Sequence, residues 1–332
     1  MLETLLAEGR PLLADGATGT TLFAMGLTSG DNPELWNALH PERILALHQG
    51  FVDAGSDIIL TNSFGGNRRR LMLHHLEGRT RELNRLAAEI ARSAADRAGR
   101  RVIVAGSVGP TGDLLAPLGP LDPEAAFEAF VEQIEGLKEG GADVLWIETM
   151  SAPEEIRAAA RAAGVLAMPY VVTASFDTAG KTMMGLAPGE LAALTDGFDP
   201  RPLAFGANCG VGASDLVMSV LAMTQAAPEA AVIAKANAGI PQWRGAHIHY
   251  SATPELMADY ARLAIDAGAR IVGGCCGSTA AHVAAMRRAI DQRVAGPRPQ
   301  LADVVAALGA LASPPSTVAG RSRSRRRDQA AP

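Results

Sequence analysis

The three cysteines of the chain are the residues best suited to hold a metal ion. Cys209 lies in the segment Gly-Ala-Asn-Cys-Gly, and Cys275 and Cys276 lie together in Gly-Gly-Cys-Cys-Gly. The flanking glycines allow the backbone to turn sharply and to approach a bound ion closely. Thiolates are soft ligands that suit zinc, and three of them leave one position open, as in catalytic zinc sites. The grouping therefore predicts a catalytic zinc centre.

A purely structural role is the alternative for these cysteines. Free cysteine is among the most buried residue types, and a lone cysteine usually belongs to a core. Here all three cysteines lie in two glycine-framed turns, and two of them are adjacent, where a disulfide would be strained. This distribution favours free thiolates in a reducing compartment, and we expect a cytoplasmic protein.

The three-thiolate ligand set also indicates a type of reaction. Zinc with neutral ligands keeps its positive charge and acidifies water, as hydrolases require. Three thiolates outweigh the charge of the ion, so this centre is a poorer activator of water. It can still bind an incoming thiol and remove its proton. The ligands therefore favour alkylation of a substrate thiol.

Eight short apolar segments follow one another along the chain with little alternation, which is typical of parallel strands buried on both faces. They cover residues 11–17, 57–64, 101–109, 144–150, 170–176, 204–210, 231–237 and 269–277. Helical patterns lie between them, with Pro, Ser or Thr near several starts. These patterns cover residues 41–54, 81–98, 123–139, 153–163, 188–194, 214–226, 254–267 and 280–290.

Polar or reactive residues lie at or near the carboxyl end of every predicted strand. An open sheet gathers its ligands at one switch point, whereas all eight strand ends of a closed barrel surround one mouth. The pattern therefore predicts a single (β/α)8 barrel, the TIM-barrel fold, with its site at that mouth. The residues are Asp15, Asn62, Ser107, Glu148, Ser175, Cys209, Asn237 and Cys275.

The composition divides the 332-residue chain into a barrel domain at 1–312 and an Arg-rich tail at 313–332, for which we predict disorder. The net charge of −5 gives no nucleic-acid signature, and no apolar run reaches the length of a membrane span. The first residues lack a basic segment followed by an apolar one, so we expect no secretion signal. The sequence is compatible with a homo-oligomer and does not determine the oligomeric state.

At the cysteine turns the chain resembles the homocysteine S-methyltransferase family, and the resemblance runs from about residue 12 to residue 290. Supporting motifs are LADGATGT, ILTNSFGG, GSVGPTG and IETM, which begin at Leu13, Ile59, Gly106 and Ile147. Within the family, the likeness is strongest to bacterial betaine–homocysteine methyltransferases, which resemble the homocysteine domain of cobalamin-dependent methionine synthase.

The resemblance implies a (β/α)8 barrel, zinc held by Cys209, Cys275 and Cys276, and homocysteine as the methyl acceptor. It places acidic residues at the homocysteine site, where they would suit the substrate's ammonium group, and it gives Asn237 the position of an oxygen ligand to zinc. Purely structural roles are the alternative for these residues: Asp15 would form a turn, and Asn237 would be a helix cap or a turn residue. The substrate-binding residues that we expect are Asp15, Gly16, Asn62, Ser107, Glu148, Ser175 and Asn237, and Glu148 is also a candidate catalytic residue.

The methyl donor is open. Betaine is the first candidate, and an onium donor calls for aromatic faces, although aromatic residues make up only 4% of this chain. S-methylmethionine and dimethylsulfoniopropionate are alternative donors. A methyl-corrinoid is a further alternative, and a partner protein would have to deliver it, because no cobalamin module is present in the sequence. The aromatic candidates near strand ends are Trp36, Phe64, Trp146, Phe176, Trp243 and Tyr250.

Two other classes of protein compete with this interpretation. A zinc hydrolase would need histidine or carboxylate ligands, and these are sparse at the predicted mouth. A non-catalytic zinc- or thiol-binding protein would hold the ion without turnover. We interpret His247 and His249, which alternate before a predicted helix, as loop residues.

Overall fold

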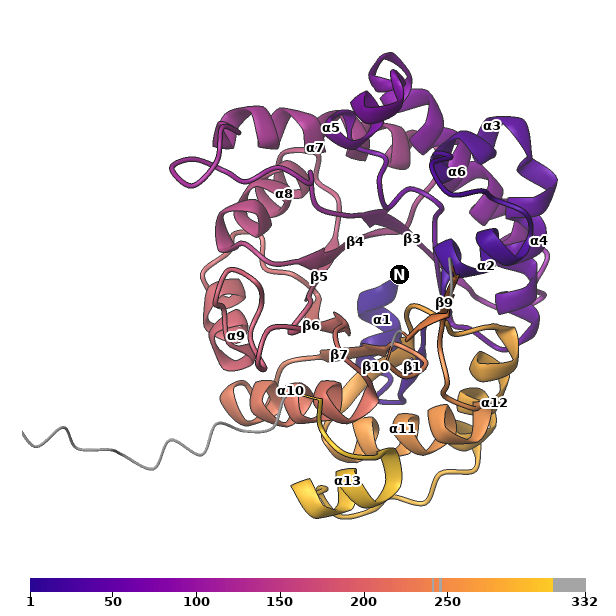
Figure 1. Ribbon diagram of the computed structural model, residues 1–332, viewed down its shortest axis with the longest axis vertical. Helices are drawn as coiled ribbons and strands as arrows, with labels where there is room; N and C mark the ends of the chain where they lie inside the picture. The colour runs from indigo at the N-terminus through magenta and orange to yellow at the C-terminus, as the bar shows by residue number, and fades with distance from the viewer. Residues whose placement is uncertain (241, 245–246, 313–332) are drawn as a thin grey trace, which may run out of the picture.

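Eight parallel strands form the centre of the structure, a computed structural model that describes residues 1–240, 242–244 and 247–312 (Figure 1). The strands lie within the eight predicted segments. The strand at 144–150 has the predicted bounds, and the other seven are shorter because the ends of their segments belong to loops. They are β1 (Leu12–Leu13), β2 (Ile58–Leu60), β3 (Ile103–Val108), β4 (Val144–Met150), β5 (Tyr170–Ala174), β6 (Ala204–Cys209), β7 (Val232–Ala236) and β10 (Ala269–Gly274).

The strand order closes the sheet into a barrel. Neighbours follow the order β1-β10-β7-β6-β5-β4-β3-β2, and a parallel bridge between Ala14 and Ile58 joins the two ends. The predicted (β/α)8 barrel is confirmed. In such a barrel the carboxyl ends of all the strands open onto the same face, so residues distant in sequence meet there.

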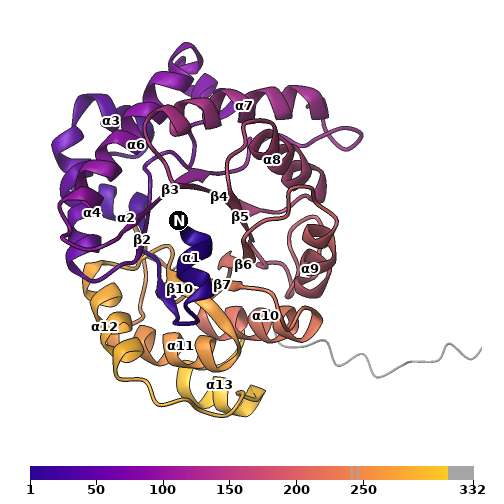
Figure 2. The ribbon, with the colours of Figure 1, turned by 180° about the vertical axis from the view of Figure 1, so that it is seen from behind.

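Eight helices surround the barrel, one after each strand (Figures 1 and 2). Proline occupies the first turn of five of them, where its missing N–H is no loss. The helices are α4 (Pro41–Asp53), α6 (Thr80–Asp96), α7 (Pro123–Glu139), α8 (Pro153–Val165), α9 (Pro188–Asp196), α10 (Ala213–Ala226), α11 (Pro254–Asp266) and α12 (Ala280–Asp291).

The remaining elements were not predicted, because most are too short to show a periodic pattern. They are α1 (Leu2–Ala7), α2 (Thr18–Ala24), η1 (Pro33–Leu35), α3 (Trp36–Leu39), α5 (Arg68–Leu71), η2 (Met72–His74), η3 (Glu77–Arg79), α13 (Leu301–Leu308) and the antiparallel pair β8 (Gln242–Arg244) and β9 (His247–His249). The prediction that His247 and His249 are loop residues is therefore wrong, because their backbone forms β9. Their side chains lie outside the described part.

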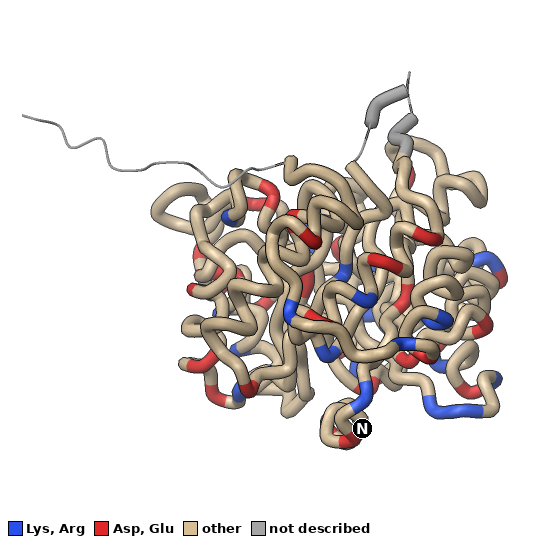
Figure 3. Tube along the Cα trace, turned by 90° about the horizontal axis from the view of Figure 1, so that it is seen from below, with Lys and Arg blue, Asp and Glu red and all other residues tan. Residues whose placement is uncertain are grey.

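Helix α1 closes the amino-terminal end of the barrel. Its Leu2 and Leu5 are buried against interior strand residues such as Leu12, Ile58 and Ile271. Figure 2 shows α1 across the barrel opening, and Figure 3 shows it projecting at that end of the molecule. A larger core lies between the strands and the outer helices. The open end is thus the opposite one, where the carboxyl ends of the strands lie.

No helix in the described ranges has both the length and the apolar character to cross a membrane. The Arg-rich tail predicted at 313–332 lies outside the described residues.

Candidate metal centre

The three cysteine sulfurs lie together at the open end of the barrel. Cys209 Sγ lies 2.8 Å from Cys275 Sγ and 3.9 Å from Cys276 Sγ, and all three sulfurs lie within 4.8 Å of one another. Zinc–sulfur bonds of about 2.3 Å in a tetrahedron place ligand sulfurs about 3.8 Å apart. The cluster therefore has the size of a metal site, with Cys209 and Cys275 closer together than bound ligands would be.

Strand register explains why the cysteines meet. Ala236 of β7 pairs with Cys209 of β6 on one side and with Gly274 of β10 on the other. The amide of Cys275 donates to the carbonyl of Ala236 at 2.7 Å. Because neighbouring strands lie about 4.8 Å apart, the two cysteine turns flank β7 at one level of the barrel.

The turns have the backbone conformations that their glycines allow. Cys209 has a φ of 58°, which is uncommon for a residue with a side chain, and Gly210 follows with a φ of 72°. Gly277 has a φ of 79°, and a Cβ there would lie 2.2 Å from the Tyr250 ring. These strained turns aim the sulfurs at one point, and such strain is often found at functional sites.

The sulfur cluster suits a cation electrostatically. Hydrogen bonds from the thiols of Cys209 and Cys275 hold the pKa of Cys276 well below the usual value for a thiol, which favours a thiolate at this position. Nδ2 of Asn208 lies 3.8 Å from Cys275 Sγ and also donates to Thr149 Oγ1 at 2.6 Å. Asn208 thereby ties the end of β4 to the cysteines, a role that its place beside Cys209 could have indicated.

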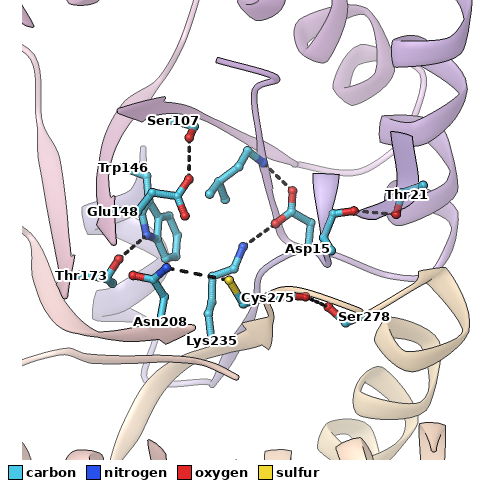
Figure 4. A network of polar contacts seen from close by, with 12 residues as sticks. Asp15, Thr21, Ser107, Trp146, Glu148, Thr173, Asn208, Lys235, Cys275 and Ser278 are labelled. Carbon is cyan, nitrogen blue, oxygen red and sulfur yellow. Dashed lines mark hydrogen bonds and ion pairs between the residues drawn. The ribbon is translucent and has the colours of Figure 1, made fainter. Parts of the chain in front are cut away.

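A buried ion pair lies beside the cysteines (Figure 4). Nζ of Lys235 contacts Asp15 Oδ1 at 2.6 Å, and Asp15 Oδ2 accepts a hydrogen bond from the Leu60 amide at 2.7 Å. Burial acts to lower the pKa of Lys235, but the attraction of Asp15, Glu148 and Cys275 outweighs it and raises that pKa above its usual value. Lys235 was missed at the sequence level, although a lysine in the apolar segment Val-Ile-Ala-Lys-Ala is itself a signal.

Glu148 lies across the barrel mouth from Asp15. Its carboxylate accepts a hydrogen bond from Ser107 Oγ at 2.5 Å, and burial raises its pKa to about 7. The Lys235 ammonium lies 5.3 Å from the centre of the Trp146 ring, whose Nε1 donates to Thr173 at 3.2 Å. Trp146 is therefore part of the barrel interior beneath the site (Figure 4).

A hollow of about 380 Å³ opens over these residues. The loops after β1, β2 and β10 and the ends of β3, β4, β6 and β7 form its walls. Its lining includes four of the seven residues expected to bind substrate and all three cysteines. The lining includes Gly16, Glu34, Asn62, Phe64, Ser107, Glu148, Cys209, Lys235, Cys275 and Cys276.

The other three expected substrate residues do not line the hollow. Asp15 is paired with Lys235 beneath it. Ser175 Oγ accepts a hydrogen bond from the Gly210 amide at 3.3 Å, and Asn237 Nδ2 donates to the Gly210 carbonyl at 2.8 Å. Ser175 and Asn237 thus support the turn that carries Cys209. The buried Oδ1 of Asn237 has no hydrogen-bond partner among the described residues, which leaves it free for a ligand.

Of the six aromatic candidates, Phe64 is the one whose described side chain lines the hollow. Trp36 instead packs against His40 and Arg43, and Phe176 lies behind the Cys209 turn. The Tyr250 ring packs on Gly277, and the side chain of Trp243 lies outside the described part. The described residues therefore do not assemble an aromatic cage in the hollow.

The fold and the site define a (β/α)8 barrel with three convergent cysteines at its carboxyl face. The chain belongs to the homocysteine S-methyltransferase family, whose model matches residues 12–290. This confirms the family resemblance found in the sequence.

Two curated relatives are methionine synthases. The chain is 30% identical over 298 residues to that of Mycobacterium tuberculosis and 29% identical over 307 residues to that of Mycobacterium leprae. These matches cover 85% and 87% of this chain but 25% of each relative. The chain therefore spans about a quarter of the length of these relatives.

Solved structures share the fold. The metallated form of the homocysteine methyltransferase MmuM from Escherichia coli matches with a TM-score of 0.72 and 27% identity, over 86% of this chain and 99% of that one. A methyltransferase from Methanosarcina mazei matches with a TM-score of 0.51 at 13% identity, over 85% of this chain and 94% of that one, which shows a shared fold alone.

Proposed function

We propose that the chain transfers a methyl group to the thiol of homocysteine at a zinc centre held by Cys209, Cys275 and Cys276, in a reducing compartment such as the cytoplasm. The observation that carries this proposal is the convergence of three sulfurs within 4.8 Å at the wall of a closed-ended hollow. The family membership and the methyltransferases named above support it.

The residues fit zinc better than a harder ion. Three sulfur donors suit a soft metal, and no carboxylate belongs to the described cysteine cluster. Three protein ligands leave a position for a substrate atom, and the unpartnered Asn237 Oδ1 is a candidate to occupy that position between turnovers. When bound, zinc would supply the acidity that keeps a substrate thiol deprotonated and nucleophilic.

The acceptor would be oriented by the charged residues of the hollow. Glu148 lines the hollow and would bind the ammonium group of homocysteine, with Ser107 holding the carboxylate in position. Asp15 would act through Lys235, because its two oxygens already have partners inside the protein. The Lys235 ammonium would offset the negative charge that three thiolates and a substrate thiolate bring together.

The methyl transfer itself needs few protein groups. The sulfur of homocysteine forms a bond to the methyl carbon, and the bond from that carbon to the donor breaks with its electron pair leaving on the donor. With an onium donor the leaving group is neutral, so no general acid is required. The chain would contribute proximity and alignment of the two substrates in one hollow.

Among donors, betaine is our first candidate, and dimethylsulfoniopropionate and S-methylmethionine belong to the same onium class. A methyl-corrinoid protein is the alternative of another type. The hollow of about 380 Å³ has room for small molecules such as the onium donors beside homocysteine.

One experiment separates these possibilities. Zinc-loaded protein and homocysteine are incubated in turn with betaine, dimethylsulfoniopropionate, S-methylmethionine and methylcobalamin, and methionine is measured. We expect methionine from at least one onium donor. Tight zinc binding without methionine from any donor would contradict the proposal and favour a zinc- or thiol-binding protein.

A variant links the chemistry to the cysteines. Cys275→Ala should lower the bound zinc by more than tenfold, measured by elemental analysis, and should abolish methionine formation. Thr195→Ala, which truncates a buried side chain of α9 outside the hollow, is the matched control and should keep both. Normal turnover by Cys275→Ala would rule out the three-cysteine mechanism.

A further inference from the structure

Glu34 is a second carboxylate in the wall of the hollow, and it belongs to none of the motifs described above. It lies in η1, and its side chain is buried, with 4% of the residue exposed. Oε1 accepts a hydrogen bond from the Gly65 amide at 2.6 Å. A Cβ on residue 65 would lie 3.0 Å from this oxygen, so the glycine allows the carboxylate to lie against the backbone of the next loop.

Glu34 has no direct ion-pair partner among the described residues. Hydrogen bonds from the Gly65 amide and from Asn32 stabilise its charge, and Arg70 attracts it only at longer range. Glu148 likewise forms no direct ion pair, but the attraction of Lys235 is the main influence that opposes its burial. Burial raises the pKa of Glu34, which reflects the cost of holding its charge away from water.

A buried carboxylate without a cation is destabilising, and hydrogen bonds offset only part of that cost. The cost is recovered when a ligand brings the missing charge. Onium donors carry a positive charge and would enter this same hollow. The usual partner of an onium group is a set of aromatic faces, but Phe64 is the aromatic residue that the described lining offers.

We propose that Glu34 is the counter-charge for the cationic head of the methyl donor and thereby selects onium compounds over molecules of the same shape whose head is uncharged. This inference rests on the proposed function, because it assumes that the donor occupies the hollow beside homocysteine. Glu34 is thus a specificity-determining residue for the donor.

The charge change of the reaction predicts which kinetic constant responds. The head of the donor is cationic when it binds and uncharged after it loses its methyl group. Attraction to Glu34 is therefore stronger in the bound ground state than in the transition state, so it lowers the donor KM without raising kcat. The neutral product is held less strongly and can leave.

The test uses pairs of ligands with the same shape and different charge. Betaine is paired with 3,3-dimethylbutanoate, in which carbon replaces the quaternary nitrogen, and dimethylsulfoniopropionate with 4-methylpentanoate. Binding of each compound to the zinc-loaded protein is measured by calorimetry without homocysteine, so that no turnover occurs. Both members of each pair carry a carboxylate, so they differ in the charge of the head alone. We expect the unmodified protein to prefer at least one positively charged head over its uncharged analogue by more than tenfold.

Glu34→Gln keeps the hydrogen-bond acceptor for Gly65 and removes the charge. We expect it to lose about tenfold of the preference for the charged head and to raise the donor KM by a similar factor without lowering kcat, while the homocysteine KM and zinc content stay unchanged. The matched control is Glu155→Gln. Glu155 is equally buried at 4% exposure and accepts hydrogen bonds from Thr111, but it does not line this hollow.

Three results would overturn the assignment: an unchanged cation preference in Glu34→Gln, equal loss in Glu155→Gln, or no cation preference in the unmodified protein. Methionine from methylcobalamin but from no onium donor would also overturn it, while homocysteine methylation would stand. Failure of every donor would instead contradict the proposed function. If Glu34→Gln does not fold, Gly65→Ala, which crowds the carboxylate, should show the same loss.

Discussion

The ammonium of Lys235 and the carboxylate of Asp15 form an ion pair at 2.6 Å, with the two side chains 3% and 0% exposed. The two residues are 220 positions apart in the sequence, with Asp15 directly after β1 and Lys235 on β7, and only β10 separates these two strands in the barrel. The pair explains why Asp15, an expected substrate residue, lies beneath the hollow. It also places a positive charge beside the cysteines.

Breaking this pair should destabilise the fold. Lys235→Met leaves the Asp15 carboxylate buried without a counter-charge, which should cost about 3–5 kcal/mol of unfolding free energy. The double variant Asp15→Asn/Lys235→Met should recover much of this loss. Urea unfolding of the metal-free protein measures both. Lys138→Met, at an exposed lysine of α7, is the control and should change stability by less than about 1 kcal/mol. Additive costs in the double variant would show that the two residues do not interact.

Glu148 should determine affinity for homocysteine. Glu148→Gln keeps the size of the side chain and removes the charge that we assign to ammonium binding. A charged hydrogen bond contributes about 1.5–3 kcal/mol, so the homocysteine KM should rise by roughly 10- to 150-fold. Steady-state kinetics at saturating donor provides the measurement, and the donor KM and zinc content should not change. An unaltered homocysteine KM would remove Glu148 from the substrate site.

His48 should make the fold sensitive to acid. Its ring nitrogens have no hydrogen-bond partner in the part of the chain that the structure describes, and burial lowers its pKa from 6.5 to about 4. The unfolded chain therefore takes up a proton below about pH 6.5, whereas the folded protein does so only near pH 4. His48 therefore does not reduce the free energy of unfolding above pH 6.5, where it is neutral in both states. As the pH falls below that value the free energy of unfolding decreases, by about 2 kcal/mol at pH 5.

Comparison with His48→Leu isolates this contribution. Urea unfolding at pH 7.5 and pH 5 should show a smaller loss of stability in the variant, by about 2 kcal/mol, because both proteins share every other titrating group. Parallel pH profiles for the two proteins would mean that His48 is solvated in the folded state.

Leu5 of α1 should stabilise the barrel without affecting the site. Leu5→Ala removes a side chain that is 4% exposed and packs into the closed end, which should cost about 2–5 kcal/mol. The homocysteine and donor KM should stay within about twofold, since the hollow lies at the other end. Leu39→Ala, at a leucine that is 59% exposed, is the control for denaturant unfolding. A changed KM in Leu5→Ala would indicate that the two ends are coupled.

Local features of the sequence determined the number of strands and the chemistry of the cysteines. A strand buried on both faces must be apolar along its length, so each strand was visible by itself, and glycine-framed cysteines are recognisable within five residues. The eight-strand barrel and the family could therefore be predicted before any contact was known. The short helices, including α1, could not, because their stability comes from packing and not from their own pattern.

Only the tertiary structure decided how charges are distributed around the cysteines. Lys235 and Asp15 are 220 residues apart, and Glu34 reaches the hollow from a short helix whose sequence carries no functional signal. Which side chains meet depends on strand register and on the closure of the barrel, and these are set by the packing of the whole core. Whether a carboxylate finds its counter-charge inside the protein or must take it from a ligand is therefore a property of the folded chain.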